Sequence, residues 1–325
     1  MITIRSRALR WTLVGPALLA LGCININLPG GVPEPLVETV LRGSFGPKIL
    51  LVSIDGVLQE GREPADFFGI TGESRIARLR EELDTARQDA EIGGLLLRIN
   101  SPGGTVTASE IIYEEIRRFK RERGVPVVAQ LMGVAASGGY YVAMAADEIV
   151  AYPTTVTGSI GVLANLLPNL TGLMDKLGIQ DQTLTTGAFK NAGSPLRSMR
   201  PEERAQLQSV IDDLFARFLE VVENGRSNLT REEIERLADG RIYSAAQAKA
   251  HGLVDHIGDL DIAIARVEAS AGAAATRLVR YHRPREYRSN VFSRPAVPPT
   301  LELELLPRWP NLPAPGFLYL WAPGS

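Results

Sequence analysis

The sequence predicts an α/β fold with a mostly parallel sheet and flanking helices. Three observations predict it: short apolar runs rich in β-branched residues, amphipathic helical segments between those runs, and glycine-containing turns where the runs end. Strands buried on both faces by helices appear as continuous apolar runs, which is typical of parallel sheets. Binding sites in such folds commonly form at the carboxyl ends of the strands.

Strands and helices are expected to alternate along the first half of the chain. The expected strands are 48–58, 93–100, 125–133 and 147–155. A helix is expected over 73–91, and another from Thr107, because Thr107 and Glu110 match a capping box. Later in the chain, a long helix is expected to begin at Pro201, with Gly225 as its terminator.

Composition divides the chain into four parts. Residues 24–47 are rich in proline and glycine and are expected to form a linker, and 48–283 form the folded domain. The last part, 284–325, is proline-dense with several aromatic residues, and we expect it to lie outside the folded core. A tail that contacts a membrane or mimics a substrate is the alternative.

Residues 1–23 have the pattern of an export signal. Basic residues precede an apolar run that is too short to span a bilayer and that ends at Cys23. The ending "LALGC" resembles the lipobox of bacterial lipoproteins, in which the cysteine carries the lipid, although Ala20 departs from the usual leucine. A plain signal peptide or an uncleaved anchor is the alternative. In each case the folded domain is expected outside the cytoplasm of a bacterium, tethered to its envelope membrane.

Composition also excludes several classes of function. The 35 basic and 37 acidic residues give a net charge of −2 and form no dense basic stripe, which argues against nucleic acid as a partner. One cysteine excludes intramolecular disulfides, and three histidines supply a metal site poorly. No metal and no cofactor are therefore expected.

Ser137, in "GVAASGGYYVAMAAD", is the candidate nucleophile. It could also be a small spacer in a tightly packed helix. Ala135 occupies the first glycine position of G-x-S-x-G, which disfavours an α/β-hydrolase. A helix that begins at the serine would leave free N–H groups, including that of Gly138. The turn "SPGG" could supply a second donor to an oxyanion, most plausibly from Gly104.

A serine nucleophile needs a base. The histidines His251, His256 and His282 are interpreted as surface residues. A lysine serves instead when desolvation lowers its pKa from about 10.4 toward neutrality. Lys190 lies in a segment of small, uncharged residues, "TTGAFKNAGSPLRSM", whereas Lys176 has the surroundings of a solvated helix charge.

Five segments together resemble the signal peptide peptidase A (protease IV) family, across roughly residues 49–270. They are "INSPGG", "GVAASGGYY", "TGSIGV", "GAFKNAGSP" and "GRIYSAAQAKAHGLVDHIG". The resemblance implies a Clp-protease/crotonase-like fold and a serine protease with a Ser–Lys dyad. It makes Ser137 the nucleophile, Lys190 the general base, Gly104 and Gly138 the donors of the oxyanion hole, and Ser159 the hydroxyl that orients the lysine.

The chain has the length of the family's single-domain members. Resemblance to these members implies a homo-oligomeric ring in which the serine of one subunit meets the lysine of the next across a subunit boundary. The expected substrates are apolar peptide segments, such as remnant signal peptides or envelope proteins, and the small residues 133–135 favour a narrow apolar pocket. Two alternatives remain at this point: a crotonase-type acyl-CoA enzyme and an exported scaffold with an inactive site.

Overall fold

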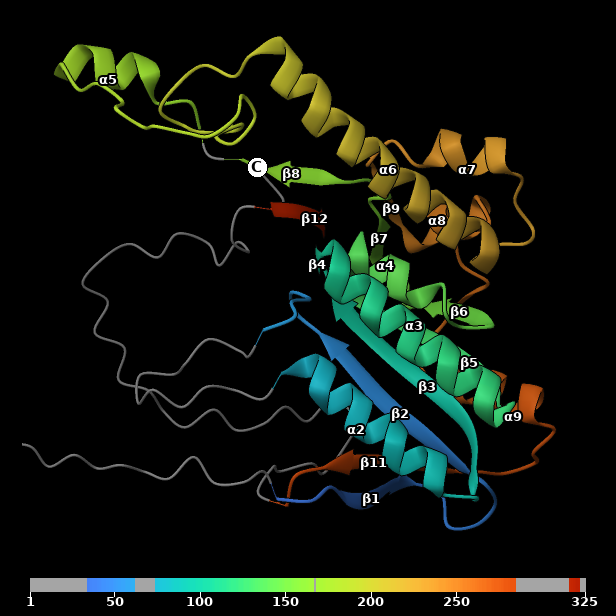
Figure 1. The fold of residues 1–325 in the computed structure, drawn as a ribbon. Coiled ribbons are helices and arrows are strands. Elements are labelled where there is room, and N and C mark those ends of the chain that lie inside the picture. Colours follow the sequence, from blue (N-terminus) through green and yellow to red (C-terminus); the bar gives the residue numbers. More distant parts are fainter. Residues whose placement is uncertain (1–33, 62–73, 167, 285–315, 322–325) are drawn as a thin grey trace, which may run out of the picture. The chain divides into compact units, whose positions relative to one another are not determined.

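The computed structural model describes residues 34–61, 74–166, 168–284 and 316–321. The elements named below all belong to one unit, Pro35–Ser325. A mostly parallel sheet forms its centre, with helices on both faces (Figure 1). The predicted α/β class is therefore confirmed.

The main sheet contains the four strands expected from the apolar runs. They are β2 (Lys48–Asp55), β3 (Ile92–Ser101), β5 (Val127–Ala136) and β6 (Glu148–Ala151), and neighbours among them pair in parallel. The path through the sheet is β1-β11-β2-β3-β5-β6-β10. Its outer strands are β1 (Val37–Arg42), β11 (Arg277–His282) and β10 (His256–Ile257). The strand β1, which lies within the expected linker, pairs antiparallel with β11.

Side chains of β2 alternate between two cores. Leu50 and Val52 belong to the larger core, and Ile49 and Leu51 belong to the smaller one. The larger core lies under helices α2 (Arg75–Gln88), α3 (Val106–Arg123) and α4 (Gly138–Ala143), and the smaller lies under α9 (Leu260–Ala271). This two-residue period is the one that a strand covered on both faces requires.

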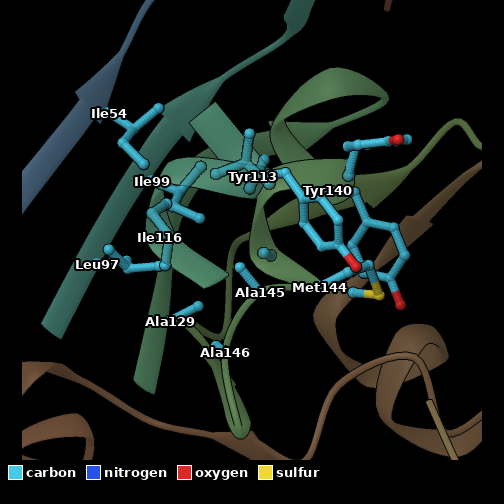
Figure 2. Packing of buried hydrophobic residues seen from close by; sticks show 14 of the residues in the cluster. Ile54, Leu97, Ile99, Tyr113, Ile116, Ala129, Tyr140, Met144, Ala145 and Ala146 are labelled. Atoms are coloured by element: carbon cyan, nitrogen blue, oxygen red, sulfur yellow. The ribbon is translucent and has the colours of Figure 1, made fainter. Parts of the chain in front are cut away.

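Figure 2 shows part of the larger core. Tyr113 from α3 and Tyr140 from α4 belong to the same buried cluster as Leu97 and Ile99 of β3, and Tyr140 lies beside Met144. Tyr140 is fully buried, and its hydroxyl donates to the carbonyl of Leu253 over 2.7 Å. Tyr140 is therefore a core packing residue.

Helix α3 begins earlier than its capping pattern predicted. The N-cap is Thr105, whose hydroxyl accepts a hydrogen bond from the Ala108 N–H over 3.2 Å. Thr107 therefore lies in the first turn, and the predicted cap is wrong by two residues. The reason is that the preceding strand ends close to the helix, so the short segment "GGT" is followed directly by helical backbone.

The long helix α6 (Pro201–Gly225) has the predicted bounds within one residue. Phe218 and Val221 on its predicted inner face are buried, while Leu207 and Ile211 nearer its start are only partly covered. Two short helices follow, α7 (Arg231–Leu237) and α8 (Ala245–Ala250). Within the described residues, the first half of α6 thus lacks a complete apolar partner.

A second, smaller sheet lies at the carboxyl end of the main one. Its order is β4 (Gly103–Thr105), β12 (Gly316–Leu320), β8 (Leu163–Asn165), and both pairings are antiparallel. The strand β12 falls in the tail that we expected to lie outside the folded core. Composition signals disorder from its prolines, but it does not reveal that a strand edge elsewhere in the chain pairs with this short apolar run.

Candidate active site

Ser137 occupies the junction between β5 and α4 in a strained conformation. Its φ is 51° and its ψ is −118°, a combination that a residue with a side chain rarely adopts. The Ser137 N–H donates to the Gly158 carbonyl over 2.7 Å, and the Ser137 carbonyl accepts from the Tyr141 N–H over 2.8 Å. Strain of this kind costs on the order of 1–3 kcal/mol and persists where the surroundings enforce it, often at functional sites.

Ser159 has the same kind of strain and lies beside Ser137. Among the described residues, these two serines are the non-glycine positions with positive φ, and the φ of Ser159 is 50°. The register of β5 against β7 (Val156–Gly158) puts Ala136 opposite Gly158, so each serine follows a paired residue. Both are buried, with 1% of Ser137 and 8% of Ser159 exposed. The structure thus brings together two of the predicted site residues.

The two predicted glycine turns meet next to Ser137. A Cβ on Gly138 would lie 3.1 Å from the Gly103 Cα and 2.4 Å from the Ser109 hydroxyl oxygen. A Cβ on Gly104 would lie 1.9 Å from the Leu58 carbonyl oxygen. Backbone packs against backbone at these positions, so side chains are excluded. Gly104 and Gly138 therefore lie in closely packed backbone beside the serine, and their role as donors to an oxyanion stays a prediction.

Strand β12 passes directly over this site. Tyr319 is paired with Gly104, and Leu320 with Gly103. The Tyr319 carbonyl oxygen would lie 1.9 Å from a Cβ on Gly103 and 3.0 Å from one on Gly138. An extended segment of the chain therefore lies antiparallel between β4 and β8, with its backbone against the glycine turns.

The Tyr319 side chain fills an aromatic pocket. Its ring centroid lies 5.1 Å from that of Tyr141 and 4.6 Å from that of Phe218. Its hydroxyl donates to the Leu214 carbonyl over 2.7 Å, and burial raises its pKa above the ordinary value. Tyr141 is also buried and donates to Glu110, and burial, followed by this bond, raises its pKa. Tyr141 is therefore a packing residue, and the proline-rich composition around Tyr319 gave no sign that this residue is buried.

Lys190 is exposed and is not brought to Ser137 within one chain. It lies in the segment from β8 to the residue before α6, residues 163–200, which we call the arm and which contains α5 (Thr171–Leu177) (Figure 1). Among the described residues, no hydrogen bond joins the Lys190 amine to the Ser137 hydroxyl. A single chain thus holds the predicted nucleophile in place but does not complete the predicted dyad.

The arm also carries most of the large apolar side chains that the described part of the chain exposes. Leu184 is 96% exposed, Leu177 64% and Phe189 51%. Others on the arm are Leu163, Leu166, Leu170, Leu173, Ile179 and Leu196. Exposed apolar groups gathered on one segment indicate a surface that a partner covers.

The histidines hold positions away from Ser137. His256 lies 3.0 Å from a carboxylate oxygen of Glu148, and His251 packs edge-on against Tyr243. His282 was expected at the surface but is buried in β11, because its ring faces Thr39 of the paired strand β1 over 2.8 Å. These positions give no support to a histidine base.

Residues 1–23, and with them Cys23, lie outside the described residues, so lipidation stays a prediction. In the part of the chain that the structure describes, we find no helix with the length and apolar character that crossing a membrane requires.

Two family models match the chain. The model described as peptidase family S49 matches residues 119–274, and the model described as Clp protease matches residues 73–157. The first match contains Ser137 and Lys190, and the second contains Gly104 and Ser137. The second match confirms the predicted Clp-protease-like fold.

Individual proteins show the same similarity. An Enterococcus faecium protein assigned as signal peptide peptidase SppA is 34% identical in an alignment of 278 residues that covers 77% of each chain. Protease 4 of Salmonella typhi is 33% identical over 237 residues, 73% of this chain but 36% of that protein. A protein of Methanocaldococcus jannaschii assigned as a protease is 39% identical over 199 residues, 61% of this chain and 63% of that protein.

Proposed function

The chain belongs to peptidase family S49, which its similarity to signal peptide peptidase SppA and Protease 4 also reflects, and we propose that it is a membrane-associated serine endopeptidase with a Ser137–Lys190 dyad. The observation that carries the proposal is the strained backbone of Ser137, held at the start of α4 against two glycine turns. A packing spacer would need no such conformation, because an unstrained serine or alanine would fill the same space.

The reaction that we propose has two steps. The neutral Lys190 amine takes the Ser137 proton as the oxygen attacks the peptide carbonyl, and the Gly104 and Gly138 N–H groups bind the oxyanion. The lysine then gives that proton to the leaving amine, the C–N bond breaks, and an acyl-enzyme remains. Lys190 next takes a proton from water as it attacks the ester, and returns the proton to Ser137 when the acid leaves. Ser159 holds the lysine amine in line.

We propose that the lysine comes from a neighbouring copy in a homo-oligomeric ring. The exposed amine, the exposed apolar residues of the arm and the half-covered start of α6 support this assembly. Contact with a second copy would remove water from Lys190. Removal of water favours the neutral amine, which is the form that can act as the base.

We propose that substrates bind as extended strands between β4 and β8. The antiparallel position of β12 and the aromatic surroundings of Tyr319 support this, since a peptide in the same place would present its side chain to Tyr141 and Phe218. Apolar segments, such as remnant signal peptides or envelope proteins, suit this surface.

The N-terminal segment would place this activity at a bacterial envelope membrane, with the domain outside the cytoplasm and Cys23 as the lipidation site. Coenzyme A is a cytoplasmic cofactor, so this location disfavours the acyl-CoA alternative. An inactive scaffold is the alternative that activity measurements must exclude.

The test uses the assembled protein and an apolar peptide ester. Ser137→Ala and Lys190→Ala should each remove hydrolysis while sedimentation shows an unchanged assembly. Lys176→Ala, which changes an exposed lysine of the same arm, is the matched control and should keep full activity. Full turnover in Lys190→Ala would refute the dyad, and no turnover in the unaltered protein would favour the scaffold.

A further inference from the structure

One carboxylate of the arm region is completely buried, although most of its neighbours are exposed. Glu203 lies in the first turn of α6, and its side chain has an exposed fraction of 0%. It receives two hydrogen bonds from Arg197, over 2.5 and 2.8 Å, and one from Arg200 over 2.7 Å. A buried carboxylate is stable only when charged donors satisfy it, and here two guanidinium groups do so.

The same two arginines hold the backbone on both sides of Lys190. Arg197 donates to the Asn191 carbonyl over 2.9 Å and to its side-chain oxygen over 2.7 Å. Arg200 donates to the Ala188 carbonyl, and its guanidinium carbon lies 5.9 Å from the centre of the Phe189 ring. Every residue from 188 to 191 except Lys190 itself is thus tied to an arginine that Glu203 fixes.

We propose that Glu203 is a positioning residue for Lys190, an inference that rests on the proposed dyad. A lysine side chain has four rotatable bonds, so its amine reaches a defined point only if its backbone is fixed. The turn that carries Lys190 has little apolar burial of its own, since Phe189 is 51% exposed. The Glu203–Arg197–Arg200 cluster supplies the rigidity that this turn otherwise lacks.

Glu203 also caps its own helix, and the two roles can be separated. One of its oxygens accepts the Arg200 N–H over 3.0 Å, which is the local capping bond. A glutamine retains an oxygen for that bond but loses the charge that orders both guanidinium groups. Glu203→Gln therefore removes the positioning more than the cap. Glu202→Gln, an exposed neighbour in the same turn, is the matched control.

The first measurement does not depend on catalysis. Amide hydrogen exchange of the assembled protein over residues 187–193 should be faster in Glu203→Gln than in the unaltered chain or in Glu202→Gln. Unchanged exchange would overturn the proposal, whatever the outcome for the dyad.

The second measurement is kinetic. With an apolar peptide ester, Glu203→Gln should lower kcat about 10- to 100-fold with little change in KM, because the base is misplaced and the substrate site is intact. The acid limb of the kcat/KM profile should move to higher pH, since a loosened lysine is more hydrated and water stabilises its charged form. A purely structural defect would lower the active fraction without moving that limb.

Arg197→Lys provides an independent variant if Glu203→Gln does not assemble. Lysine keeps the charge but cannot bridge Glu203 and Asn191 with a planar fork, so the same changes should appear in weaker form. Faster exchange combined with unaltered kcat and an unmoved acid limb would overturn the positioning role while the dyad stands. Full activity of Lys190→Ala would refute the dyad, and the positioning role with it.

Discussion

The surroundings of Ser137 and those of Lys190 differ in almost every physical respect. Ser137 is 1% exposed, strained, and enclosed by strands, a helix and two glycine turns. Lys190 lies on an arm whose large apolar residues face outward, and the described part of that arm is held to α6 through arginines. The surroundings of Ser137 are complete within one chain. Those of Lys190 have the exposed apolar surface that is typical of an interface.

This difference shows which part of the proposed chemistry folding alone prepares. The energy to strain Ser137 and to pack glycine backbone against backbone comes from the buried core of one chain. In the proposed ring, a neighbouring copy would complete the surroundings of Lys190. Catalysis and oligomerisation would then be one equilibrium, in which a separate chain is folded but inactive.

The largest effect that tests this contrast is complementation between two inactive variants. Assemblies of Ser137→Ala alone or Lys190→Ala alone should be inactive. An equal mixture, unfolded and reassembled together, should recover about a quarter of the unaltered activity, because one site in four pairs an intact serine with an intact neighbouring lysine. Hydrolysis of the peptide ester measures the recovery. No recovery in verified mixed assemblies would mean that each site draws both residues from one chain.

Among substitutions around Ser137, one at Gly104 should lower kcat most. Gly104→Ala would put a Cβ 1.9 Å from the Leu58 carbonyl oxygen and so displace the turn. We expect a loss of about 100- to 1000-fold in kcat, the usual cost of one oxyanion donor. Gly172→Ala, on the arm where no atom lies within 4 Å of the new Cβ, should keep its activity. Circular dichroism should show that both variants are folded, and equal kcat values would exclude Gly104 from the site.

A charge at an exposed position of the arm should weaken assembly without affecting the fold of one chain. Leu184 is 96% exposed, and covering such a side chain contributes about 1.5–3 kcal/mol. Leu184→Glu should therefore raise the dissociation constant of the assembly by about 10- to 100-fold in sedimentation, and activity should fall with it on dilution. Gln182→Glu adds the same charge nearby and is the control. An unchanged constant would place the interface elsewhere.

The surroundings of Ser137 were also easier to predict from the sequence than those of Lys190. Ser137, the start of α4 and the glycine turns follow from local patterns, because strand ends and helix starts are set by neighbouring residues. The contact of Gly103 with Gly138 and the burial of Tyr319 depend on segments far apart in the chain, for which periodicity carries no information. The prediction that His282 lies at the surface was wrong for the same reason. Its burial comes from pairing with β1, a segment that we had expected to be a linker because of its composition.

Tyr319 contacts both the Gly104 turn beside Ser137 and Phe218 of α6. Its replacement by alanine should have a moderate effect on KM. If β12 occupies the path of a substrate, Tyr319→Phe should leave the ring in place, whereas Tyr319→Ala should free the pocket beside Tyr141 and Phe218. We expect KM for an aromatic peptide ester to fall about tenfold in Tyr319→Ala, since a competing occupant no longer reduces the accessible fraction of sites. A higher KM, with a loss of thermal stability, would make β12 a purely structural strand.

The smallest expected effect is a dependence of the arm on acid. Hydrogen bonds from Arg197 and then Arg200 hold the pKa of Glu203 well below its ordinary value of 4.5. Because the folded pKa is the lower one, the stabilisation is present above pH 4.5 and is lost as the pH falls below it. Hydrogen exchange over residues 187–193 should therefore accelerate on acidification beyond the intrinsic change for free amides.

Glu203→Gln should remove most of that acceleration, since an amide does not titrate. Glu233 on α7 is the matched comparison: its pKa is also lowered, by hydrogen bonds from the Thr230 N–H and hydroxyl, but neither group contacts the turn of Lys190. Glu233→Gln should leave the acid response of residues 187–193 in place. If both variants kept that response, another group would control the arm. Glu203 would then not be the residue that fixes the turn of Lys190, although Ser137 and Lys190 would still differ in their surroundings.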